Sequence, residues 1–201
     1  EIAMSAENPA YIPFIICGRG TCGKTHLLRA MAGGVARKLG SGSVFTGTVE
    51  ELRAMASEDK APGIFKQRLL RYRAIFIDNG HELAKFPELQ KKLIDIIDIF
   101  RERRKIFVLA LDDGLDRTTV DQKLRSRFEA GLVVTVKKPD LDIRLRYARA
   151  QCAANRLHLK KELLLPIAQR FQTIPSIQGI VSKVAAFQKR TDKPVTSADL
   201  E

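Results

Sequence analysis

The stretch Gly18-Arg19-Gly20-Thr21-Cys22-Gly23-Lys24-Thr25 decides the fold, because it has the G-x-x-x-x-G-K-T spacing of a phosphate-binding loop. The apolar residues 12–17 before it predict a buried strand. Residues 25–32 after it have the apolar spacing of a helix, which Gly33-Gly34 is expected to end. A strand before the loop and a helix after it are the context that the motif requires, which argues against a glycine-rich turn that arose by chance.

Each part of this loop has a physical task in holding a polyphosphate. Glycines let consecutive backbone N–H groups point into one concavity, and the start of the next helix adds partial positive charge. Lys24 supplies a full charge to the outer phosphates, and the Thr25 hydroxyl can ligate Mg²⁺. The sequence therefore predicts a site for ATP or ADP with Mg²⁺, formed by Gly18, Arg19, Gly20, Thr21, Cys22, Gly23, Lys24, Thr25 and His26.

The rest of the chain alternates between apolar runs and amphipathic segments. Strands are expected at residues 43–47, 74–78, 106–111 and 132–136, and helices from residue 48, at 64–70 and at 87–104. This alternation indicates an α/β fold in which helices cover both faces of a parallel sheet. Residues 140–154, 161–171 and 175–187 predict three helices without a strand, and residues 193–200 predict a turn and a capped helix start. We expect a P-loop core over residues 1–138 and a helical lid over residues 139–201.

Carboxylates follow two of the predicted strands. Asp78 ends one strand and can hold Mg²⁺ opposite Thr25, although a strand-end aspartate can also cap the next helix. Asn79 comes next, and an amide cannot accept a proton from an attacking water, so we expect weak hydrolysis unless Glu82 substitutes. Asp112 follows the neighbouring strand and is expected near the phosphates, with a plain turn as the alternative.

Composition and charge narrow the class of protein. The chain has 201 residues, of which 45% are hydrophobic, which excludes a wholly disordered chain. It has no apolar stretch near the roughly 18 residues of a membrane span, no signal peptide and no metal-ligand spacing among its three cysteines. These features predict that the protein is located in the cytoplasm, where cysteines stay reduced. A net charge of +12 favours polyanionic partners such as nucleic acid.

Basic residues gather in three places. Arg125 and Arg127 lie two residues apart, and an arginine there can stabilise phosphoryl-transfer charge on a neighbouring subunit's nucleotide. Two further clusters can hold phosphates: Lys66, Arg68, Arg71 and Arg73, and then Arg101, Arg103, Arg104 and Lys105. The alternative for each group is a solvated charged surface.

Four segments, in this order, resemble the ATPase domain of the bacterial replication initiator family DnaA: Asn8-Pro9 and residues 23–28, 124–132 and 138–144. The similarity covers about residues 8–200. It implies an AAA+ nucleotide-binding core with a helical lid. By matching motif it places Lys24 and Thr25 in Walker A, Asp78 in Walker B, Asp112 at sensor I and Arg127 at the arginine finger. It also places residues 48–73 where that family has two helices for filament assembly and single-stranded DNA.

Two departures from the family pattern bear on activity. Asn79 replaces the second Walker B acid, and Pro175 lies where the sensor II arginine is expected. The family also continues into a helix-turn-helix beyond the point where this sequence stops. We therefore expect a DnaA-like ATP- or ADP-binding protein that assembles with like or related AAA+ subunits. The alternatives are an Hda-like regulatory module that does not turn over nucleotide and a helicase-loader or transposition-helper ATPase.

Overall fold

The computed structural model describes residues 11–58, 61, 63–117, 119–157, 159 and 161–191. These residues form two compact units. The first contains residues 11–20 and 24–136, and the second contains residues 21–23 and those from 137 onward. The Asn8-Pro9 segment and the helix start expected at residues 193–200 lie outside the described residues.

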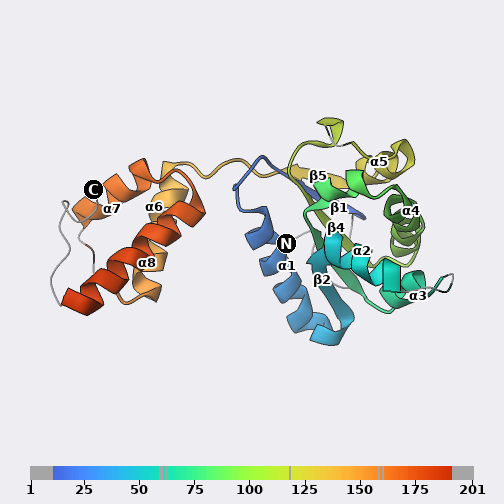
Figure 1. Ribbon diagram of the computed structural model, residues 1–201, viewed down its shortest axis with the longest axis horizontal. Helices are drawn as coiled ribbons and strands as arrows, with labels where there is room; N and C mark the ends of the chain where they lie inside the picture. Colours follow the sequence, from blue (N-terminus) through green and yellow to red (C-terminus); the bar gives the residue numbers. More distant parts are fainter. Residues whose placement is uncertain are drawn as a thin grey trace. The chain divides into compact units, whose positions relative to one another are not determined.

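A five-stranded parallel sheet forms the centre of the first unit (Figure 1). The order across the sheet is β2-β3-β4-β1-β5. The strands are β1 (Phe14–Cys17), β2 (Val44–Thr48), β3 (Ala74–Asp78), β4 (Ile106–Leu111) and β5 (Leu132–Thr135). Because the strands are parallel, their carboxyl ends lie together, and so the loops after β1, β3 and β4 meet at one end of the sheet.

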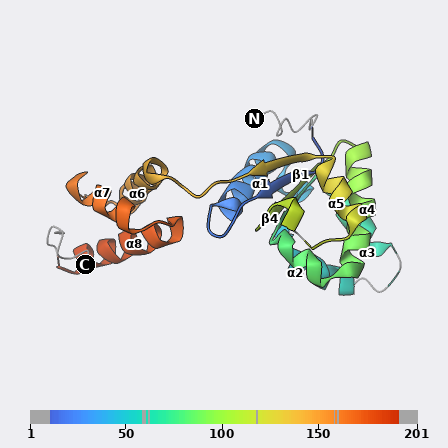
Figure 2. The same ribbon diagram turned by 90° about the horizontal axis from the view of Figure 1, so that it is seen from above.

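Side chains on the strands alternate between two apolar cores. On β3, Ile75 and Ile77 belong to one core, and Ala74 and Phe76 belong to the other. The helices of the first core are α2 (Val49–Glu58), α3 (Ile64–Leu70), α4 (Pro87–Glu102) and α5 (Gln122–Glu129). The second core lies under α1 (Lys24–Leu39), on the opposite face of the sheet in both views (Figures 1 and 2). The predicted α/β class, with helices on both faces of a parallel sheet, is confirmed.

The predicted end of α1 at Gly33-Gly34 is wrong. The helix continues to Leu39, and Gly40 follows it with a φ of 86°, a positive value that glycine adopts readily. Ala32 and Val35 are buried against the sheet on either side of the glycine pair. This packing outweighs the cost of about 1 kcal/mol that each glycine adds inside a helix.

The other helices and strands agree closely with the sequence prediction. The helix α2 begins with a capping box: the Glu51 N–H donates to Oγ1 of Thr48 (3.2 Å), and the Thr48 N–H donates to Oε2 of Glu51 (2.6 Å). Both hydrogen bonds satisfy backbone groups that a helix start otherwise leaves open. Asp121 caps α5 in a similar way by accepting from the Lys123 N–H at 2.8 Å.

The second unit is helical throughout its described elements. Its helices pack around their own core: α6 (Leu141–Ala154), α7 (Lys161–Arg170) and α8 (Ile174–Thr191). Pro175 lies in the first turn of α8, where proline is tolerated because the first N–H groups of a helix have no partner inside it. Thr173 caps this helix by accepting from the Ser176 N–H at 3.2 Å. The proline therefore has a structural role at the position where the sequence resemblance places the sensor II arginine.

Candidate functional site

Lys24 is the buried cation of the phosphate-binding loop. It is 6% exposed, and its ammonium group donates to the carbonyl oxygens of Gly18 (2.6 Å) and Gly20 (2.9 Å). Its Nζ also lies 3.0 Å from Oδ1 of Asp112, a residue about half exposed. A buried ammonium is stable only when acceptors compensate for its lost hydration, and these three acceptors match its three N–H bonds.

The loop after β4 is joined to the phosphate-binding loop by two ion pairs. One is the contact of Lys24 with Asp112, and the other joins Arg19 to Asp113 at 2.8 Å. Nδ1 of His81 approaches Oδ2 of Asp112 from a third segment, at 3.5 Å. The structure thus places Asp112 against the predicted lysine. The contact of His81 could not be predicted from the sequence, because it depends on the adjacency of β3 and β4, which no local pattern encodes.

Asp78 ends β3 at the same end of the sheet. Its Oδ1 accepts a hydrogen bond from the Asn79 N–H at 2.9 Å. Asn79 has a φ of 55°, in the left-handed region that asparagine enters more readily than most residues. Asn79 therefore satisfies a backbone requirement as well as standing where a second acid is expected. Glu82, in the short helix η3 (Gly80–Lys85), forms an ion pair with Lys85 at 3.4 Å.

The residues of the loop fit a nucleotide with Mg²⁺. Gly20 and Gly23 have φ values of 60° and 102°, and a Cβ built at either would enter open space. Thr25 lies half-buried in the first turn of α1, where helix N–H groups and the macrodipole favour an anion. Thr25 and Asp78 would hold Mg²⁺, while phosphate and water oxygens complete its shell. Of the other predicted loop residues, Cys22 is buried, and Arg19, Thr21 and His26 are exposed.

No cluster of three or more His, Cys, Asp or Glu side chains that could hold a metal ion occurs among the described residues.

Arg127 is held within its own chain. Its Nε and Nη2 donate to Oδ1 and Oδ2 of Asp98 at 3.3 and 3.1 Å, and its Nη1 donates to the Lys123 carbonyl at 3.3 Å. The hydrogen bond and the charge of Asp98 raise the pKa of Arg127, so the guanidinium stays charged.

A buried glutamine that the sequence analysis missed links two parts of the site. Gln90 in α4 is 4% exposed. Its Nε2 donates to the carbonyl of Leu83 in η3 at 2.7 Å, and its Oε1 accepts from the N–H of Asp121 at 2.6 Å. Gln90 thus connects the segment after Asp78 with the cap of the helix that carries Arg127. A polar residue at an otherwise apolar position of α4 was the signal that could have found it.

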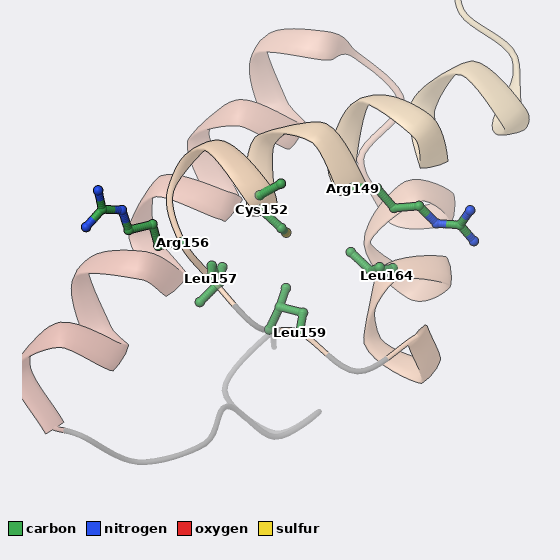
Figure 3. A pocket seen from close by; sticks show the side chains of 7 residues that line it. Arg149, Cys152, Arg156, Leu157, Leu159 and Leu164 are labelled. Carbon is green, nitrogen blue, oxygen red and sulfur yellow. The ribbon is translucent and has the colours of Figure 1, made fainter.

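A hollow of about 670 Å³ lies in the second unit (Figure 3). Its lining is Arg149, Cys152, Ala153, Arg156, Leu157, Leu159 and Leu164. The side chains of Arg149 and Arg156 extend away from the leucines, and burial raises the pKa of the Cys152 thiol. The lining of the hollow is mostly apolar.

Residues 1–135 of the chain match the family model described as the bacterial DnaA ATPase domain. The chain belongs to this family. The resemblance inferred from the four sequence segments is therefore confirmed, and DnaA-family relatives extend the match into the helical unit. Among the described residues, no helix is long and apolar enough to cross a membrane.

Two curated relatives show how far the match extends. The chromosomal replication initiator DnaA of Corynebacterium aurimucosum is 28% identical over 95% of this chain and 36% of its own length. That of Deinococcus deserti is 29% identical over 96% of this chain and 44% of its own length. The chain thus spans less than half of either relative.

Solved structures show the same fold. Domain III of the Thermotoga maritima replication initiation protein DnaA has a TM-score of 0.86 at 23% identity, covering 96% of this chain and 84% of that one. AMPPCP-bound DnaA from Aquifex aeolicus has a TM-score of 0.80 at 22% identity, covering 95% of this chain and 62% of that one.

Proposed function

We propose that this DnaA-family chain binds ATP or ADP with Mg²⁺ at residues 18–25 and acts in, or regulates, the initiation of bacterial DNA replication. The observation that carries the proposal is the burial of Lys24 at the start of α1, directly after the glycine-rich loop that follows β1. A lysine side chain is rarely buried unless its charge is paired. At this loop the natural ligand for that charge is a phosphate.

Each residue of the site has an assigned role in this proposal. The phosphates are surrounded by the backbone of the loop and by His26 in the first turn of α1; the loop residues are Gly18, Arg19, Gly20, Thr21, Cys22 and Gly23. Lys24 neutralises the outer phosphates, and Thr25 and Asp78 hold Mg²⁺. Asp112, which contacts Lys24, responds to the presence of the outer phosphate. We also propose that the core and the lid divide at residue 138 and that the protein is cytoplasmic.

Hydrolysis is proposed to be weak. Bound Mg²⁺ would neutralise charge on the phosphates, but the attacking water also needs a group that accepts its proton. The amide of Asn79 can orient water and cannot take that proton. Glu82 is engaged with Lys85 at 3.4 Å, which makes it a poor substitute.

Assembly is proposed to proceed through Arg127. In the single chain the guanidinium pairs with Asp98, and nucleotide on a neighbouring DnaA-related subunit would replace that carboxylate. One solved structure of the same fold is a replication initiator DnaA bound to AMPPCP and single-stranded DNA, with a TM-score of 0.80 at 22% identity. Its ligands support nucleotide and nucleic acid as partners of this chain as well.

A second candidate function follows from Asn79 and Pro175. A chain without the second acid and without the lid arginine suits an Hda-like regulatory module that binds nucleotide without turning it over. A helicase-loader or transposition-helper ATPase is the remaining alternative. Phosphate-release assays with and without an initiator partner separate these functions, since a module of the second kind shows no turnover alone.

The test of the nucleotide site is a titration of fluorescent ADP with Mg²⁺ into the chain and into Lys24→Ala. The variant should lose binding because the phosphates lose their buried counter-charge. Lys38→Ala is the matched control, since Lys38 is an exposed lysine in the last turn of the same helix. Equal affinity of all three proteins, with folding checked by circular dichroism, would remove the assignment of the loop.

A further inference from the structure

The amino end of the sheet, opposite the phosphate-binding loop, carries a concentration of arginines. They come from two segments far apart in the sequence, the end of α3 and the end of α4. All five are exposed: Arg71, Arg73, Arg101, Arg103 and Arg104. We call these five residues the arginine patch.

Backbone and side-chain contacts bring the two segments together. β3 and β4 begin side by side, with Ala74 paired with Ile106, and the Ile106 N–H donates to the Arg73 carbonyl at 3.1 Å. Nζ of Lys105 donates to the carbonyl oxygens of Leu70 (2.5 Å) and Tyr72 (3.0 Å). The patch is therefore one surface of the first unit.

Four of the five arginines of the patch are not neutralised by acidic residues among the residues that the structure describes. Within the part of the chain that the structure describes, Arg71, Arg73, Arg101 and Arg103 form no ion pair. Glu102 is exposed among them and is likewise in no ion pair there. By contrast, the cations at the carboxyl end of the sheet are paired with aspartates. A surface of uncompensated arginines attracts a polyanion.

Two further observations concern the arginines of the patch: the pKa of a neighbouring lysine and the backbone conformation of Arg104. Burial lowers the pKa of Lys105, and the charges of Arg103 and Arg73 lower it further. Arg104 has a φ of 50° directly after α4, a left-handed position where glycine is the usual residue. The chain thus keeps an arginine at a position where it costs conformational energy, which is often a sign of a functional constraint.

We propose that the arginine patch binds the phosphate backbone of double-stranded nucleic acid, independently of the nucleotide site. Guanidinium groups pair with phosphate oxygens through two parallel hydrogen bonds. None of the large apolar side chains that are exposed belongs to residues 71–73 or 101–105, so the patch has no anchor for a lipid surface.

The lack of a free aromatic ring favours a duplex over a single strand. Proteins that hold single strands stack bases on exposed aromatic side chains. Tyr72, the aromatic residue within the patch, is only partly exposed, and its ring packs against Phe45 with centroids 5.6 Å apart. Backbone phosphates are therefore what the patch can recognise, without base sequence.

Helix stabilisation is the competing explanation for these arginines. α3 and α4 both end at this surface, and cations near a helix C-terminus interact favourably with the macrodipole. That explanation predicts that removing the charges lowers thermal stability and leaves nucleic-acid affinity unchanged. Binding and unfolding measurements on the same variants therefore separate the two.

The experiment compares the full chain with Arg73→Gln/Arg103→Gln by fluorescence anisotropy of a labelled duplex of mixed sequence. The control is Arg146→Gln/Arg190→Gln, which removes two exposed arginines of the helical unit and changes net charge equally. Affinity is measured between about 50 and 200 mM salt. Relative to the unchanged chain, the patch variant should bind the duplex about tenfold or more weakly. The slope of log affinity against log salt concentration should become shallower by about 1.8, which is about 0.9 for each lost phosphate contact. The control should bind like the unchanged chain.

Several results would overturn the proposal. The first is an equal loss of duplex affinity in the patch variant and the control variant. The second is tighter binding of the single strand than of the duplex by the unchanged chain. The third is a patch variant that no longer binds phosphatidylglycerol vesicles but binds the duplex as the unchanged chain does. Arg73→Lys/Arg103→Lys keeps the charge and should retain the salt slope with a smaller loss of affinity. If circular dichroism shows that the glutamine variant does not fold, the lysine variant provides the test. A lysine variant that binds the duplex as tightly as the unchanged chain refutes recognition by guanidinium pairs.

Discussion

Replacing Asp112 with asparagine should weaken the nucleotide-free fold and strengthen nucleotide binding. In the structure, Oδ1 of Asp112 occupies the third N–H of the buried Lys24 ammonium at 3.0 Å. An asparagine oxygen can still accept this hydrogen bond, so the substitution removes the charge and keeps the shape. The two effects have opposite signs because the same carboxylate compensates the lysine and repels a phosphate.

The magnitudes follow from the exposure of the pair. Hydrogen bonds to charged groups contribute about 1.5–3 kcal/mol, and neutral ones contribute about half as much. The Asp112 side chain is 48% exposed, so solvent screening reduces the difference to about 1 kcal/mol of unfolding free energy. Removing the charge that competes with a phosphate for Lys24 should return a similar energy, which corresponds to about fivefold tighter binding of Mg²⁺·ADP or Mg²⁺·ATP.

Urea unfolding without nucleotide and calorimetric titration with nucleotide measure the two quantities. Asp113→Asn is the matched control, because its carboxylate pairs with Arg19 in a contact where both side chains are about half exposed or more. Breaking such a surface pair should change either quantity little. If Asp112→Asn binds nucleotide more weakly than the unchanged chain, the idea that Asp112 competes with phosphate for Lys24 is wrong.

Three other substitutions test separate parts of the account. Asn79→Asp supplies a second carboxylate in a residue that also tolerates the left-handed backbone, so phosphate release should rise severalfold, and an unchanged rate means that the missing acid does not limit turnover. Gln90→Leu leaves the Leu83 carbonyl and the Asp121 N–H without their partner, which should lower the unfolding free energy in urea by about 2 kcal/mol, whereas an unchanged midpoint would show that water replaces the amide. Arg104→Gly relieves a left-handed arginine and should raise the unfolding free energy by about 0.5–1 kcal/mol; a lower melting temperature contradicts this.

Local patterns were sufficient for most of the fold. The glycine spacing of residues 18–25 fixed the loop between β1 and α1, and continuous apolar runs located the buried strands, because a sheet covered on both faces needs no polar positions. The wrong helix end predicted at Gly33-Gly34 shows that glycine alone does not mark where a helix ends. A glycine pair ends a helix only when the apolar spacing also stops, and here Val35 continues it.

The contacts within the site were harder to predict, because they join residues distant in the sequence. Asp112 could be placed near Lys24 from the parallel sheet, but the approach of His81 requires the strand order. The pairing of Arg127 with Asp98 requires the packing of α5 against α4, which periodicity does not give. Sequence patterns name the residue types of a site, and tertiary packing decides their partners.

The central claim is that Lys24 and its loop hold the phosphates of a nucleotide. Isothermal titration calorimetry of the folded chain with Mg²⁺·ADP and Mg²⁺·ATP tests it most directly, with Lys24→Ala run alongside. The account predicts one binding event per chain for each nucleotide and none for the variant. A folded, unchanged chain that binds neither nucleotide, or a variant that binds as tightly as the unchanged chain, would contradict it.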